Sequence, residues 1–399
     1  AVFEERQNLI QEGMRGDDGQ ENRGGNQETM NTDLAQDGIM LGMSASNRSI
    51  SSALGCDTET VTKSMQSLKE VIENPRFTQE DFEHVKNLLT DVISTREKSA
   101  YDKLDEEFYK GLPNGYTKDE ILKDLETITL DDVKALYSEL MKNGKGMVSV
   151  SAPFDRKSEL KQEFFNNLGT FAPVKEFSQE KLQEIYKPTE EIKVLTDTDY
   201  KNQAEIIEAF RFPINQNVKD NASLKLLNII LGGTPSSRLF MDLRENEKLA
   251  YHVKSHYTNH DNMGVMALRI GTTTENKETG ETSFDNVQKS IDGFNRHIEK
   301  IKTEKVTDEE LNNAKLTLKN NILSALHSSD GKNNTLIQSG DSAYGIQRVN
   351  LYFKEIDKIS ADDIYNTANY IFSGKPTYSI VATENTLKAN EEYLRKLKN

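Results

Sequence analysis

An arginine and a tyrosine lie seven residues apart in the segment SSRLFMDLRENEKLAY, which spans residues 236–251. Arg244 is a permanent cation with five N–H donors, and Tyr251 carries a neutral hydroxyl that can also donate. Preorganised donors of this kind stabilise the negative charge that develops on a carbonyl oxygen during acyl transfer. The spacing alone has little specificity, so its meaning depends on the surrounding sequence.

Three histidines offer a rival site, because His252, His256 and His260 recur every four residues. On a helix this spacing would place the imidazoles on one face, as a metal site requires. Here the surrounding residues alternate like a strand, where residues four apart lie about 13 Å from each other and cannot share one ion. We therefore expect strand-face or hairpin residues. The single cysteine, Cys56, excludes a cysteine-based zinc cluster and a disulfide framework.

The composition restricts the possible partners. The chain of 399 residues has a formal net charge of −15, which argues against nucleic acid as a ligand, because nucleic-acid binding needs a basic face. The charge is compatible with basic peptides, although we expect most of it on solvated helix surfaces. No stretch approaches the roughly 18 apolar residues of a membrane span, and the N-terminal sequence lacks the pattern of a signal peptide. These features predict a soluble protein and leave its compartment open.

The chain repeats a pattern of segments. FTQEDFEHVKNLLTDVIST, from Phe77, resembles VTDEELNNAKLTLKNNILS, from Val306. Downstream, ITLDDVKALYSELM, from Ile128, resembles ISADDIYNTANYIF, from Ile359. Each copy continues with a Gly-Lys turn and a short predicted strand, MVSVSA or YSIVAT. Three matches in the same order and at nearly constant offset predict a duplicated domain.

Each copy combines strands with capped helices. A threonine followed by acidic residues, as in TQEDF and TDEEL, predicts a helix N-terminus, and ITLDD and ISADD begin helices in a similar way. Upstream of these helices, residues 38–55 and 250–272 alternate like strands. Strands grouped before helices predict an α+β fold of two tandem domains, each an antiparallel sheet with helices on one face. We place the domains at residues 1–170 and 191–399, with a linker at 171–190, and expect the first domain to lack the opening strand.

The segment LGGTPSSRLFMDLRENEKLAYHVKSHY closely resembles the C-terminal domain of M16 metallopeptidases, the family of insulinase, pitrilysin and mitochondrial processing peptidase. The opening KNQAEIIEAFRFP and the run SGDSAYGIQRVNLYFKEIDKISADDIYNTANYIF agree with the same family. The resemblance covers residues 190–399, and the first copy matches more loosely. It implies that both copies are M16 (LuxS/MPP-like) domains.

The resemblance also implies an active site assembled from two halves. In this family one half binds Zn²⁺ through the histidines of an H-x-x-E-H motif and a distant glutamate, and the motif glutamate is the general base. The other half lacks zinc and contributes an arginine with a tyrosine seven residues later, which Arg244 and Tyr251 match. Arg238 also lies in the shared run, but its spacing is wrong for the arginine of the pair.

The zinc motif itself is missing from this sequence. None of the six histidines begins H-x-x-E-H: His84, His252, His256, His260, His297 and His327. In the opening helix of the first copy, Gln7, Ile10 and Gln11 occupy the motif positions, and none of them can bind zinc or act as the base. The glycine-rich segment 15–29 lacks the Lys-Ser/Thr ending of a phosphate-binding loop and predicts a connection. We expect no cofactor in this chain and Zn²⁺ in a partner half.

Together these features predict the non-zinc half of a zinc metallopeptidase, inactive alone and active only with an HxxEH-bearing partner. That partner is either a separate subunit or the N-terminal half of a longer polypeptide. In the family the two halves enclose a chamber that admits peptides, so unfolded peptides are the expected substrates. The alternative is a catalytically inactive scaffold or peptide-binding subunit of the same fold. Retention of both Arg244 and Tyr251 argues against that alternative.

Overall fold

A computed structural model describes residues 34–45, 49–97, 99–143, 146–152, 160–162, 164, 166, 187–198, 202–214, 218–260, 263–276, 278–340 and 347–398. These residues form two compact units. Unit 1 comprises the described parts of 1–96 and 109–177, and unit 2 those of 97–108 and 178–399. The motif positions Gln7, Ile10 and Gln11, the segment 15–29 and the linker residues 171–186 lie outside the described residues.

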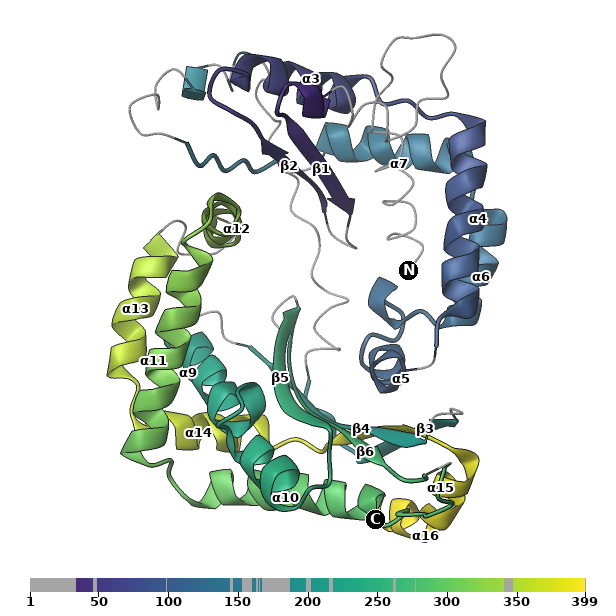
Figure 1. Cartoon of the computed structure of the whole chain (residues 1–399), viewed down its shortest axis with the longest axis vertical. Helices are drawn as coiled ribbons and strands as arrows, with labels where there is room; N and C mark the ends of the chain where they lie inside the picture. Colours follow the sequence, from purple (N-terminus) through teal and green to yellow (C-terminus); the bar gives the residue numbers. More distant parts are fainter. Residues whose placement is uncertain are drawn as a thin grey trace. The chain divides into compact units, whose positions relative to one another are not determined.

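Unit 1 consists of a β-hairpin and helices with a small core (Figure 1). Its elements are β1 (Met40–Ala45), β2 (Ile50–Gly55), α3 (Val61–Glu73), α4 (Gln79–Thr95), η1 (Pro113–Gly115), α6 (Lys118–Thr127) and α7 (Leu130–Asn143). The two strands pair antiparallel, as their alternation predicts. The core includes the buried residues Phe82 and Val85 of α4 and Val133 of α7. The strand predicted for MVSVSA is not formed, because residues 146–152 pair with no described strand.

The predicted helix starts are confirmed. In α4 the N–H of Asp81 donates to the hydroxyl of Thr78 over 3.1 Å. In unit 2, Thr307 and Glu310 form a reciprocal capping box at the start of α11 (Asp308–Ala325), and Ser360 caps α14 (Ala361–Ile371) in the same way. Each cap satisfies donors that the first helical turn leaves free, which is why a threonine or serine followed by acidic residues marks these boundaries.

Unit 2 is built on a five-stranded sheet in the order β3-β7-β4-β6-β5 (Figure 1). The strands are β3 (Lys193–Thr198), β4 (Gln203–Pro213), β5 (His252–His260), β6 (Met263–Thr273) and β7 (Thr377–Ala382). The strand-like segment 250–272 forms β5 and β6, which pair antiparallel. The expectation of a purely antiparallel sheet is wrong at one pair, because β3 runs parallel to β7. Strand β5 forms one edge of the sheet and begins directly after Tyr251.

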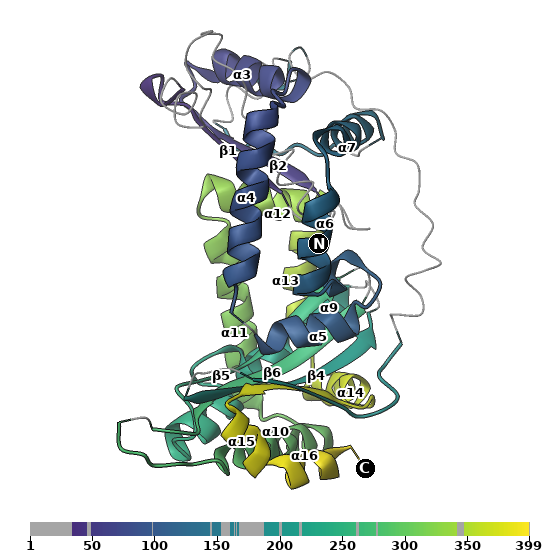
Figure 2. The same cartoon turned by 90° about the vertical axis from the view of Figure 1, so that its right-hand side faces the viewer.

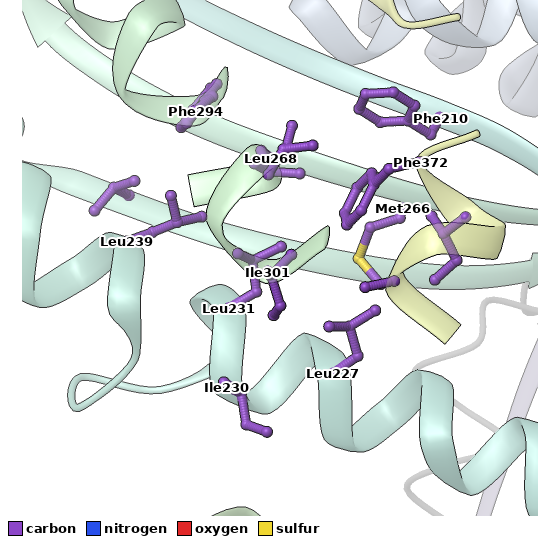
Figure 3. Packing of buried hydrophobic residues seen from close by; sticks show 14 of the residues in the cluster. Phe210, Leu227, Ile230, Leu231, Leu239, Met266, Leu268, Phe294, Ile301 and Phe372 are labelled. Carbon is purple, nitrogen blue, oxygen red and sulfur yellow. The ribbon is translucent and has the colours of Figure 1, made fainter. Parts of the chain in front are cut away.

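Helices cover one face of this sheet and enclose the main core (Figure 2). The remaining elements of unit 2 are α9 (Val218–Asn228), the π-helical turns η3 (Ile229–Gly233) and η4 (Phe240–Asn246), α10 (Asn286–Thr303), α12 (Ser329–Gly340), α13 (Arg348–Lys358), α15 (Glu384–Ala389) and α16 (Glu391–Leu397). Figure 3 shows Leu227 and Leu231 of α9 and η3 in the same cluster as Met266 and Leu268 of β6 and Phe294 of α10. No helix among the described residues is long and apolar enough to cross a membrane.

One helix lies on the opposite face of the sheet, which corrects the expectation of helices on one face only. Helix α5 (Ala100–Phe108) belongs to unit 2, although it follows α4 of unit 1 along the chain (Figure 2). The carboxylate of Glu205 on β4 accepts the N–H of Ala100 over 3.0 Å, and so satisfies a free donor of the first turn. An ion pair of 3.3 Å joins Lys103 to Asp197 on β3. These contacts fix α5 to strands that are distant in sequence.

Candidate functional site

The structure brings Arg244 and Tyr251 together from two different elements. Arg244 lies in the last turn of η4, and Tyr251 is the residue before β5. The guanidinium carbon of Arg244 lies 6.0 Å from the centroid of the Tyr251 ring and 4.5 Å from that of Phe240. The cation therefore lies within reach of two aromatic rings, and it is attracted to their faces.

Tyr251 projects into solvent beside this cation. Its exposed fraction is 80%, whereas the side chain of Arg244 is 38% exposed. The Nε atom of Arg244 lies 3.6 Å from Oε1 of its neighbour Glu245. An exposed tyrosine that contacts an arginine leaves its hydroxyl available to a ligand. Because the side chain of Tyr251 is so exposed, its position is set mainly by the backbone that carries it.

That backbone is a tight turn between η4 and β5. The N–H of Leu249 donates to the carbonyl of Leu243 over 2.9 Å, and the hydroxyl of Thr272 donates to the carbonyl of Leu249 over 2.7 Å. Lys248 has a φ of +57°, and no other non-glycine residue of the described chain has a positive φ. The left-handed residue reverses the chain so that Tyr251 returns towards Arg244.

The conformation of Lys248 leads to a prediction about stability. A left-handed conformation costs an ordinary L-residue about 1–2 kcal/mol, and most of all a β-branched one. Lys248→Gly is therefore expected to keep the free energy of unfolding within about 1 kcal/mol or raise it, and Lys248→Val to lower it by about 1–2 kcal/mol. Urea unfolding of the two variants tests this. Equal stabilities would show that the turn does not impose the conformation.

Arg238 has a structural role in the neighbouring turn. Its Nε and Nη2 atoms lie 2.7 and 3.0 Å from the two carboxylate oxygens of Glu310, and its side chain is largely buried. Partial burial opposes the charge of Glu310, but the hydrogen bonds from Arg238 and from the backbone of Thr307 outweigh it and lower its pKa. The pair connects the start of α11 to the segment before η4. In this arrangement the guanidinium of Arg238 is occupied by Glu310.

The three regularly spaced histidines lie on strand β5, as expected. Burial, then the neighbouring Arg269, lowers the pKa of His252, whose ring packs on Gly271. Among the described residues, no group of three or more His, Cys, Asp or Glu side chains is arranged to hold a metal ion. The candidate site itself offers a cation and a phenol, and a guanidinium would repel a metal. The residues around Arg244 and Tyr251 therefore do not fit a zinc ligand set.

Sequence reasoning did not identify Phe240 as a contact of Arg244. The two residues are four apart, the spacing at which side chains meet along an α-helix, so a local signal was present. It also did not identify Arg296 and His297, which approach the same turn from α10. Those two residues lie about fifty positions further along the chain, and no local pattern connects them to Arg244.

The chain is similar to proteins of one family. Residues 127–318 match the family model described as the peptidase M16 inactive domain. An uncharacterized zinc protease of Rickettsia felis is 27% identical over 336 residues, 81% of this chain and 75% of that protein. The non-peptidase homolog YmxG of Helicobacter pylori is 26% identical over 251 residues, 61% of this chain and 57% of that protein.

A solved structure has the same fold. The peptidase M16 inactive domain from Pseudomonas fluorescens superposes with a TM-score of 0.73 at 16% identity, over 96% of this chain and 88% of that chain. The matched residues, 127–318, include Arg244 and Tyr251. The match begins before residue 190, where the resemblance noted in the sequence begins. Residues 127–318 of the chain therefore resemble the M16 peptidase family, and the chain shares the fold of its inactive domain.

Proposed function

We propose that this chain is the non-zinc half of an M16 zinc metallopeptidase and completes the active site of an HxxEH-bearing half. The observation that carries the proposal is the meeting of Arg244 and Tyr251 with Tyr251 80% exposed. The reaction is hydrolysis of peptide bonds in unfolded peptides. On this proposal the two units correspond to tandem M16 domains, and the chain is inactive by itself.

In this role Tyr251 stabilises the transition state. When water attacks a peptide carbonyl, negative charge develops on the carbonyl oxygen, and a donor placed at that oxygen lowers the barrier. The Tyr251 hydroxyl is such a donor. It can therefore donate to the oxygen without binding the metal of the other half. Zn²⁺ in the other half would supply the activated water.

Arg244 would hold the tyrosine and the substrate. Its guanidinium contacts the Tyr251 ring and the Phe240 ring, so it can restrict the orientation of the phenol. Five N–H donors also allow it to bind peptide carbonyls of an extended substrate. Restricting a catalytic donor before the reaction is what makes the donor effective.

A non-catalytic scaffold is the second candidate. Its support comes from the matched relative of Helicobacter pylori, which is named a non-peptidase homolog, and from the family description as an inactive domain. A scaffold would bind peptides or partner subunits without needing the Tyr251 hydroxyl. The two candidates therefore differ in what the assembled halves do to a peptide.

Reconstitution with a zinc half distinguishes these candidates. An HxxEH-bearing M16 protein from the same genome, or the upstream part of the same reading frame, would be mixed with this chain and Zn²⁺. Cleavage of a quenched fluorescent peptide library would then be followed. The proposal predicts that neither half alone cleaves and that the mixture does. Binding of peptides by the mixture without cleavage would support the scaffold.

A further inference from the structure

An ionic cluster on α10 holds the turn that carries Arg244. The Nη2 atom of Arg296 lies 2.7 Å from Oδ2 of Asp242 and 2.5 Å from Oε1 of Glu247. The Nε2 atom of His297 lies 2.8 Å from the same oxygen of Asp242. Asp242 and Glu247 flank Arg244, one before it in η4 and one at the end of the turn. A single guanidinium therefore joins both ends of the segment that carries the candidate residue.

The protonation states favour this cluster. Partial burial opposes the charge of Asp242, but hydrogen bonds from Arg296 and His297 outweigh it, so the pKa of Asp242 lies below its ordinary value. Burial lowers the pKa of His297, Asp242 raises it, and the charges of Arg296 and Arg238 lower it further, so that the net shift is downward. The downward shift favours the neutral imidazole, whose Nε2–H tautomer would donate to the carboxylate of Asp242. Asp242 is charged and accepts two hydrogen bonds from α10.

Close packing supports the ionic contacts. A Cβ atom added to Gly293 of α10 would lie 2.5 Å from a methyl carbon of Leu243, which is fully buried in η4. Gly293, Arg296 and His297 are three and four residues apart, so they share one face of α10. This face therefore contacts η4 both through a glycine that admits Leu243 and through two donors.

The turn itself needs such support. In η4 the N–H of Glu247 donates to the carbonyl of Asp242 over 2.9 Å, a bond that spans five residues. Turns of this π-helical kind are rare and occur mostly as local bulges, frequently at functional sites. Rewinding to an α-helix would change the rotation of every residue after the bulge. Arg244 would then leave the Tyr251 ring.

We propose that Arg296 is a positioning residue for Arg244 and Tyr251. By binding Asp242 and Glu247 together it keeps η4 in its π-helical form and so keeps the guanidinium of Arg244 against the tyrosine. The catalytic consequence rests on the proposed function. The structural part does not, because it concerns this chain alone.

The structural part is tested by hydrogen exchange of the full chain. In Arg296→Ala the amides of residues 242–251 are expected to exchange at least about tenfold faster than in the unsubstituted chain. The reason is that the lost ion pairs lower the free energy of local opening. Arg296→Lys is expected to give an intermediate rate. Lys289→Ala removes a cation from the same helix, where it pairs with Asp285 at 2.7 Å, and is the matched control. Unchanged exchange in Arg296→Ala would overturn the inference.

A spectroscopic probe adds a second readout. The chain contains no tryptophan, so Tyr251→Trp would report on this position alone. Arg296→Ala and Arg244→Ala are each expected to lower the fluorescence anisotropy of Trp at this position, and the double substitution to lower it no further, because both act through one contact. Full anisotropy in the Arg296→Ala background, together with unchanged exchange, would refute a positioning role.

The catalytic consequence is tested in the assembled enzyme. Arg296→Ala is expected to lower kcat about tenfold with KM within about twofold, and to have little further effect in a Tyr251→Phe background. Faster exchange without activity in any assembly would retain the positioning role and reject the proposed function. An active assembly in which Arg296→Ala changes neither exchange nor kcat would retain the function and reject the positioning role.

Discussion

Tyr251→Phe is expected to lower kcat of the assembled peptidase at least about tenfold, which corresponds to about 1.4 kcal/mol of lost transition-state stabilisation. The substitution removes only the hydroxyl and keeps the ring that contacts Arg244. Loss of one oxyanion donor costs about 2.7–4 kcal/mol in well-studied cases, so a larger decrease is compatible with the role. Because the hydroxyl acts in the transition state, KM should change little. Initial rates with one cleaved peptide measure both constants.

A second tyrosine of unit 2 provides the control. Tyr370 on α14 is half exposed, and its hydroxyl donates to the carbonyl of Pro213 over 2.7 Å. Tyr370→Phe removes a hydroxyl and one hydrogen bond, and kcat should stay within about twofold of the unsubstituted enzyme. Arg244→Ala should lower kcat as Tyr251→Phe does. Equal kcat in Tyr251→Phe and Tyr370→Phe would exclude the hydroxyl of Tyr251 from the reaction.

Glu208→Gln is expected to stabilise unit 2 at neutral and alkaline pH. Glu208 lies at the centre of strand β4 and is fully buried; burial raises its pKa to about 8, and a hydrogen bond from Tyr378 acts in the opposite direction. The Tyr378 hydroxyl donates to Oε1 over 3.3 Å, whereas Oε2 has no hydrogen-bond partner among the described residues. A glutamine side chain has nearly the shape of the protonated glutamate and stays neutral at every pH.

The sign of the pH effect follows from proton binding. Between the unfolded pKa of about 4.5 and the folded value of about 8, the folded state keeps the proton of Glu208 and the unfolded state has lost it. The free energy of unfolding therefore falls as the pH rises through this window, by up to about 1.4 kcal/mol per pH unit. Glu208→Gln removes that slope, so the stabilisation should reach a few kcal/mol near pH 8.

Urea unfolding between pH 5 and pH 9 measures this difference. Glu278→Gln, at an exposed position of the β6–α10 connection, is the control and should keep the slope of the unsubstituted chain. Other titrating groups contribute to every curve alike, so the difference between the two variants isolates Glu208. Parallel curves for both variants would mean that Glu208 is ionised in the folded protein.

The local parts of this fold could be predicted from sequence because their signals are local. Thr78, Thr307 and Ser360 mark helix starts through hydrogen bonds within one turn, and all three caps are formed. The hairpin of β5 and β6 follows from alternation along adjacent segments. After β6, a bridge joins Glu275 and Thr282.

The remaining features depend on contacts between distant parts of the chain. Nothing near Ala100 indicates that α5 docks on β4 through Glu205, which lies about a hundred residues away. The parallel pairing of β3 with β7 joins segments that are separated by most of unit 2. Long-range pairing is set by the packing of the whole unit, and single-segment periodicity does not contain it.

The candidate site likewise combines features with a local sequence signal and features that depend on distant residues. The spacing of Arg244 and Tyr251 is visible in the sequence, but it does not show that the two side chains meet. Their contact depends on a π-helical turn and on the left-handed Lys248, where no glycine marks the unusual conformation. It also depends on Arg296, which no local pattern connects to the turn.

Titrating one half against the other shows whether the two halves form one active site. A fixed amount of the HxxEH-bearing half with Zn²⁺ would receive increasing amounts of this chain, and peptide cleavage would be measured at each point. We predict no cleavage without the chain, a rise to a plateau at equal amounts of the two halves, and a plateau at least about tenfold lower with Tyr251→Phe at the same midpoint. Full cleavage by the zinc half alone, unaffected by added chain, would contradict the account.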